Sequence, residues 1–115
     1  MRASISWWDL DESEQTIDSL REYLRDEGVT PWESVRGLRL KFWIADPAAN
    51  RWGAVMLWES DDGPGDQQLP PHRALELIGY PPAHRESFTV EATVEGRYDL
   101  AVLAGRGAAF GVPAR

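Results

Sequence analysis

Hydrophobic residues along this chain recur with two spacings, one typical of strands and one typical of helices. Residues 3–8 and 87–94 alternate apolar with polar side chains, which predicts a strand in each segment. Two longer apolar runs lie between residues 37 and 60, separated by the turn-forming residues 46–50. We expect these two runs to form an antiparallel hairpin.

Two further segments have the periodicity of helices. Asp11 followed by Glu14 matches a capping box and predicts the start of a helix that ends at Gly28. Pro71 is suited to the first turn of a second, shorter helix that ends at Gly79. The apolar stripes consist of Ile17, Leu20, Tyr23 and Leu24 in the first helix and of Ala74, Leu75 and Ile78 in the second.

The predicted order is strand, helix, strand, strand, helix, strand, within a single domain of residues 1–115. This order is typical of the ferredoxin-like βαββαβ arrangement, an α+β fold whose antiparallel sheet carries both helices on one face. The apolar tail from residue 98 to residue 115 is expected to dock on its own subunit or on a partner subunit, because its apolar side chains need cover.

Both faces of the hairpin are apolar, so both need to be packed. Its first strand is expected to place Leu38, Leu40, Phe42 and Ile44 on one face and Arg39, Lys41 and Trp43 on the other. Two helices cover one face only, and we expect a second copy of the chain to cover the other, which predicts a homodimer. The sequence leaves open whether Trp43 or Phe42 faces a ligand.

The composition narrows the possible partners. The chain has 43% hydrophobic and 27% charged residues, a net charge of -7 and a pI of about 4.7. Its acidic surface would repel nucleic acids and anionic membranes, so neither is expected as a partner. The sequence has no cysteine, which excludes disulfides and cysteine zinc sites and fits a cytoplasmic location. No secretory signal or membrane span is expected.

The hairpin also carries a family resemblance. Residues 37–44 (GLRLKFWI) and 52–59 (WGAVMLWE), together with Pro47 and Asn50, resemble the second and third strands of the dimeric α+β barrel proteins. Within them the chain is similar to the YdhR-like group, which lies close to the antibiotic-biosynthesis monooxygenases. The resemblance implies a homodimeric barrel with a pocket between sheet and helices, and oxidation of a polyketide-like phenol by dioxygen without flavin, haem or metal.

Such chemistry requires a dry pocket that binds an aromatic molecule, removes a proton and stabilises the resulting anion. The candidate catalytic residues are His72, His84, Arg39 and Lys41. The candidate substrate-binding residues, drawn mainly from the six tryptophans, are Trp7, Trp43, Trp58, Met56 and Tyr80. Two histidines without cysteine predict no metal site.

Each candidate also has a structural interpretation. The tryptophans also suit the core or a dimer interface, and the two histidines a surface or capping role. Arg39 and Lys41 also suit ion pairs with Glu91, across the sheet or across the dimer. The same pocket would also suit a polyketide cyclase or isomerase, or a non-catalytic accessory protein that binds an aromatic metabolite. The glycine-rich residues 105–111 lack the spacing of a dinucleotide-binding loop, and no hydrolase motif occurs.

Overall fold

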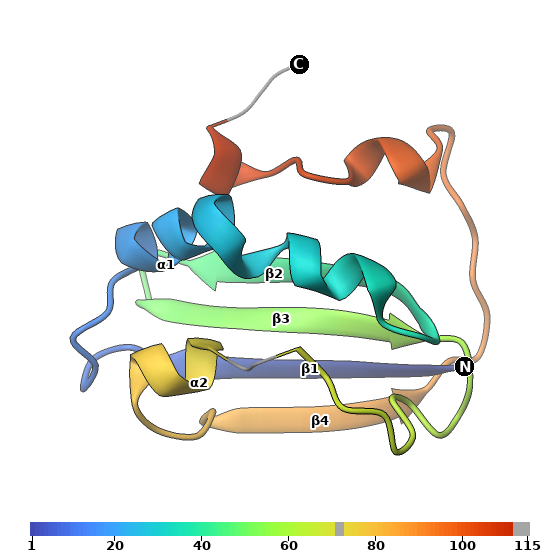
Figure 1. The fold of residues 1–115 in the computed structure, drawn as a ribbon, viewed down its shortest axis with the longest axis horizontal. Helices are drawn as coiled ribbons and strands as arrows, with labels where there is room; N and C mark the ends of the chain where they lie inside the picture. The colour runs from blue at the N-terminus through green and yellow to red at the C-terminus, as the bar shows by residue number, and fades with distance from the viewer. Residues whose placement is uncertain (71–72, 112–115) are drawn as a thin grey trace.

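The computed structural model describes residues 1–70 and 73–111 and shows a four-stranded antiparallel sheet with two α-helices on one face (Figure 1). The strands are β1 (Arg2–Asp9), β2 (Leu38–Asp46), β3 (Arg51–Trp58) and β4 (His84–Thr89), and the helices are α1 (Ile17–Tyr23) and α2 (Arg73–Ile78). The sheet order is β2-β3-β1-β4. The predicted α+β class and element order are confirmed, and the topology is consistent with a ferredoxin-like fold.

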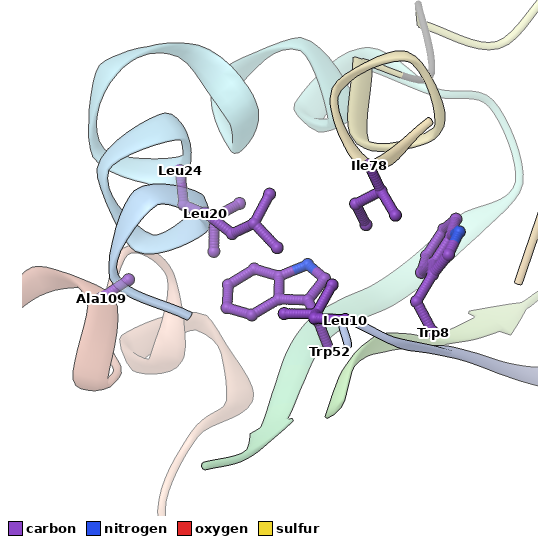
Figure 2. Packing of buried hydrophobic residues seen from close by; sticks show 7 residues of the cluster. All are labelled: Trp8, Leu10, Leu20, Leu24, Trp52, Ile78 and Ala109. Carbon is purple, nitrogen blue, oxygen red and sulfur yellow. The ribbon is translucent and has the colours of Figure 1, made fainter. Parts of the chain in front are cut away.

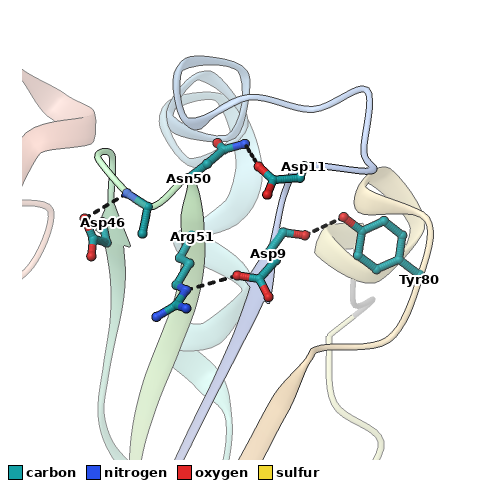
Figure 3. Close-up of polar contacts among 7 residues, drawn as sticks. Asp9, Asp11, Asp46, Asn50, Arg51 and Tyr80 are labelled. Carbon is teal, nitrogen blue, oxygen red and sulfur yellow. Dashed lines mark hydrogen bonds and ion pairs between the residues drawn. The ribbon is translucent and has the colours of Figure 1, made fainter.

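The predicted hairpin is confirmed as an antiparallel pair of β2 and β3. Its turn needs one left-handed residue, which is Asn50 with a φ of 57°. The Asn50 side chain donates to Asp11 Oδ1 at 3.0 Å, and Arg51 Nε donates to Asp9 Oδ1 at 3.0 Å (Figure 3). These contacts fasten the turn to the end of β1.

The first helix begins later than its predicted start, and the capping box predicted at Asp11 and Glu14 is wrong. Thr16 is the N-cap: its Oγ1 accepts from the Ser19 N–H at 3.0 Å, and Ser19 Oγ accepts from the Thr16 N–H at 2.8 Å. Asp11 is already engaged by the hairpin turn. After α1 the chain continues as the π-helix η1 (Leu24–Gly28), so the predicted end at Gly28 is confirmed.

The last strand is displaced from its predicted range of residues 87–94. It ends at Thr89 because Thr89 pairs with Arg2, the first residue of β1, and the Val90 N–H then donates to the Met1 carbonyl at 3.1 Å. Beyond that point no strand within residues 1–70 and 73–111 pairs with this segment. The alternating pattern of residues 90–94 therefore gives no strand among the described residues.

Two short 3-10 helices follow β4: η3 (Leu100–Leu103) and η4 (Ala108–Phe110). Ala109 is buried in the core cluster, and its carbonyl accepts from Arg25 Nη1 at 2.7 Å. Within the described part of the predicted tail, η4 thus packs on the chain, whereas the apolar side chains Leu100, Val102 and Leu103 of η3 are 46% to 52% exposed. Residues 112–115 of that tail lie outside the described residues.

The core packs between the sheet and the helices, at the end of the sheet where Trp8 pairs with Trp52 (Figure 2). Its buried residues are Trp8, Leu10, Leu20, Leu24, Trp52, Ile78 and Ala109. This cluster identifies the helix-covered face of the sheet, hereafter the inner face. None of the helices in residues 1–70 and 73–111 is long and apolar enough to cross a membrane.

Strand register assigns the other side chains to faces, since residues paired directly across an antiparallel sheet point to the same side. The inner face holds the cross-strand rows Ala45–Trp52–Trp8, Trp43–Ala54–Ser6, Lys41–Met56–Ser4 and Leu38–Trp58–Arg2. The opposite, outer face holds Ile44–Gly53–Trp7–His84, Phe42–Val55–Ile5–Glu86 and Leu40–Leu57–Ala3–Phe88.

A β-bulge at Arg39 places one side chain on the face opposite to its predicted one. Leu38 pairs with Trp58 and Leu40 pairs with Leu57, so two steps on β2 match one step on β3. Leu38 therefore lies on the inner face, and not with Leu40, Phe42 and Ile44 as strict alternation predicts. The rest of the predicted alternation holds: Lys41 and Trp43 lie on one face, and Leu40, Phe42 and Ile44 on the other.

Candidate functional site

The middle of the inner face holds a row with two polar side chains, between the core cluster and the buried Trp58. The core cluster covers the Trp52 end of the sheet, and Trp58 is buried at the other end. Between them, Lys41 on β2 lies across from Met56 on β3, which lies across from Ser4 on β1. These residues are only partly buried, so the row combines a cation, a thioether and a hydroxyl in a place that solvent or a ligand can still reach.

Lys41 lies between two indole rings. Its Nζ is 3.1 Å from the ring centroid of Trp32 and 4.9 Å from that of Trp43, both within the range of a cation–π contact. Trp43 is two residues further along β2 on the same face. Trp32 comes from the 3-10 helix η2 (Thr30–Ser34), where Pro31 near the N-terminus fixes the first turn.

Two effects act in opposite directions on the pKa of the Lys41 amine. Burial lowers its pKa from 10.5 to about 7, because desolvation disfavours the ammonium. The indole faces favour the ammonium. Among residues 1–70 and 73–111, no carboxylate lies within ion-pair distance of Lys41. A large neutral fraction at physiological pH makes the amine a proton acceptor and a nucleophile.

The other strand-borne cation that the sequence singles out is placed differently. Arg39 lies at the bulge with a side chain that is 61% exposed, and its Nη1 lies 2.8 Å from Glu59 Oε1. Within the single chain Arg39 thus pairs with Glu59 and not with Glu91 across the sheet, while pairing with Glu91 across a dimer stays a prediction. Lys41 has no ion pair within the described residues. Arg39 is therefore not part of the Lys41 row.

His84 and Trp7 lie on the outer face, away from Lys41. Their rings are stacked with centroids 4.4 Å apart and planes 1° from parallel, and His84 Nε2 is 2.7 Å from Glu86 Oε2. The structure therefore brings two of the predicted site residues together with each other, but on the wrong side of the sheet for Lys41. His72, a further candidate, lies outside the described residues.

The remaining predicted substrate-binding residues lie either in the Lys41 row or at the two ends of the inner face. Met56 faces Lys41 directly, and Trp58 closes the buried end of the inner face. Tyr80 lies at the opposite end, where its hydroxyl donates to the Asp9 carbonyl (Figure 3) and its own carbonyl accepts from Trp8 Nε1 at 2.7 Å. Tyr80 thus fastens the segment after α2 to β1.

A groove of about 520 Å³ runs along the outside of η2. Pro31, Ser34 and Val35 line one wall and residues 67–70 line the other. Gln67 holds the walls together, since its Nε2 donates to the Arg36 carbonyl at 2.6 Å. Trp32 lies between the groove-lining residues Pro31 and Ser34 in sequence, so the same short helix borders the groove and supplies the indole over Lys41.

The site and fold together define an α+β protein with one partly buried lysine held between indoles on the helix-covered side of its sheet. Over the described residues, no group of three or more histidine, cysteine, aspartate or glutamate side chains is arranged to hold a metal ion. The sequence matches no protein-family model and no curated protein.

Proposed function

We propose that the chain is a homodimeric enzyme that removes a proton from a small aromatic, phenol-type substrate and promotes its oxidation by dioxygen without a cofactor. The observation that carries the proposal is Lys41, an amine without a carboxylate partner among the described residues, between Trp32 and Trp43. The resemblance of residues 37–59 to the YdhR-like proteins supports the same reaction class. The absence of cysteine fits a cytoplasmic enzyme.

In this reaction Lys41 acts as the general base. Its neutral amine accepts the substrate proton and becomes an ammonium, which then stabilises the substrate anion beside it. The electron-rich anion reduces dioxygen. For an anthrone, one oxygen atom enters the ring carbon that loses two hydrogens, and the second oxygen leaves with those hydrogens as water. The indoles and Met56 offer the apolar surface that binds a planar ring.

The homodimer is the second part of the proposal, and the outer face supports it. This face is apolar across three strands, and Phe42 is 46% and Phe88 50% exposed. In the three outer rows named above, the ionisable side chains are Glu86 and His84 at the β4 edge, and a fourth row of the same face at the turn end, Asp46–Arg51–Asp9, is charged. Two such sheets packed face to face would cover these side chains with one symmetric interface and complete a dimeric α+β barrel.

Oxygen uptake by metal-stripped protein tests the reaction. With anthrone and naphthol-type substrates, we expect uptake with a product one oxygen richer, and Lys41→Met should lower kcat by about 100-fold or more, the usual loss on removing a general base. Arg39→Gln is the matched control, since Arg39 is a neighbouring cation outside the row. It should keep nearly full activity.

Other outcomes would overturn either the oxygenase assignment or the role of Lys41. A product of unchanged mass, or one lighter by a water molecule, would assign a cyclase or isomerase. Quenching of tryptophan fluorescence without any product would assign a binding protein. Equal losses in Lys41→Met and Arg39→Gln would remove Lys41 from the catalytic role.

A further inference from the structure

Lys41 is the single lysine of the chain, and its surroundings suit covalent chemistry as well as proton transfer. We propose that the Lys41 amine forms an imine with an aromatic aldehyde or ketone bound on the inner face between Trp32 and Trp43. The inference uses the same side chain as the proposed function but requires neither dioxygen nor a phenol. It would make the protein a carbonyl-binding protein whether or not it is an oxygenase.

The geometry favours an aromatic carbonyl compound over other carbonyls. Nζ lies 3.1 Å and 4.9 Å from the two indole centroids, so a ring carried on the carbonyl carbon would lie close to both indoles and could contact Trp43, which is partly exposed, whereas Trp32 is buried. Met56 adds apolar surface across β3. No described carboxylate neutralises the ammonium or competes for the amine, and Lys41 remains partly exposed, so a ligand can reach it.

The hydroxyl of Ser4 offers a second polar contact for a ligand, across the sheet from Lys41. Ser4 lies two strands from Lys41 in the same row, which is about 10 Å at ordinary strand spacing. Neither Ser4 nor Ser6 has a side-chain hydrogen bond to another described residue. A fused aromatic ring system with its carbonyl at Lys41 would therefore bring a polar substituent at its far end to these hydroxyls.

The covalent step is balanced without a further reactant. The neutral amine attacks the carbonyl carbon and forms a C–N bond, and the carbonyl oxygen takes up the two amine protons and leaves as water. The product is an imine, which a solvent proton converts to the iminium ion. Because burial lowers the Lys41 pKa to about 7, the attacking neutral form is abundant near neutral pH.

Reductive trapping tests the inference. The protein is incubated under nitrogen near neutral pH with 2-hydroxy-1-naphthaldehyde and sodium cyanoborohydride, and then analysed by intact mass and peptide mapping. We expect a single adduct on Lys41, heavier by the aldehyde minus its oxygen atom. Its formation should be saturable in aldehyde and at least about 100-fold faster than for an exposed lysine, because an unperturbed lysine is almost fully protonated at this pH.

The matched control moves the lysine by two residues. The double variant R39K/K41M has its one lysine at the exposed bulge position, and that lysine should remain unlabelled over the time that labels Lys41 in the wild type. The other amine, at Met1, is ion-paired with Asp61 at 3.1 Å, and peptide mapping counts any adduct there separately in both proteins.

Three outcomes would overturn the inference: labelling at Met1 alone, labelling of the control variant as fast as the wild type, or labelling of Lys41 that increases linearly with aldehyde and never saturates. Wild-type peptide mapping decides the site even where the variant folds poorly. Since dioxygen is absent, trapping succeeds or fails independently of oxygenase activity.

Discussion

Replacing Phe42 with glutamate is expected to convert the proposed homodimer into a monomer. Phe42 lies in the middle of β2 on the outer face, in one row with Val55 and Ile5, and 46% of its surface is exposed in the single chain. In a symmetric interface, both copies would carry the new carboxylate into an apolar contact. An uncompensated buried charge costs several kcal/mol, so the dissociation constant should rise at least about 100-fold.

Sedimentation velocity at micromolar concentration measures this change. Leu75→Glu is the matched control, because Leu75 has a similar exposure of 41% but lies on α2, on the other side of the sheet. It should leave the dimer intact. A wild-type protein that sediments as a monomer would contradict the homodimer, and so would a Phe42→Glu variant that remains as dimeric as the Leu75→Glu control.

Replacing Lys41 with methionine is expected to change how stability depends on pH. In the unfolded chain lysine keeps its proton up to its usual pKa of 10.5, whereas folded Lys41 loses it near 7. Between these values the unfolded state binds more protons, so the free energy of unfolding of the wild type rises with pH. Below pH 7 both states are protonated, and the full cost of the buried ammonium is present.

The Lys41→Met variant lacks this linkage. Relative to the variant, the wild type should gain up to about 1.4 kcal/mol per pH unit above pH 7, and the variant should be the more stable protein at about pH 6. Urea denaturation from about pH 6 to about pH 9 measures the difference. Arg39→Met is the control, since its exposed guanidinium stays charged and its difference from the wild type should be independent of pH.

Most elements of the fold could be predicted from short sequence segments, because residues close together in the sequence determine them. The apolar runs of the hairpin and its Asp46–Asn50 turn predict β2 and β3 closely, and Gly28 ends the first helical segment where expected. A Cβ at Gly28 would lie 2.8 Å from the Tyr23 ring, so close packing favours glycine there. These features need no knowledge of distant partners.

The errors in the predicted fold arise from contacts far apart in sequence. The end of β4 is decided by where β1 begins, 87 residues earlier, between Arg2 and Thr89. Asp11 satisfies a local capping pattern, yet it accepts from Asn50 on the hairpin turn, and Thr16 caps the helix instead. The alternation of apolar and polar residues does not show which of two suitable partners a side chain contacts in the folded chain.

The site was only partly predictable for a similar reason. Lys41, Trp43 and Met56 follow from alternation once the covered face is known, but the covered face is decided by the core that Trp8 and Trp52 form with the helices. That choice places Trp43 inward and Phe42 outward. Trp32 carries no local signal, since it lies in a short 3-10 helix between apolar runs, and only the folded chain brings it to Lys41.

Near neutral pH, Lys41 is expected to present a large fraction of neutral amine to the inner face. Because the chain has one lysine, protein made with 13C-labelled lysine gives one lysine Cε signal in an NMR spectrum, and its chemical shift can be followed through a pH titration. We expect a titration midpoint near the lowered pKa of about 7. A midpoint near the usual 10.5 would show a solvated ammonium and contradict both the base and the imine-forming role.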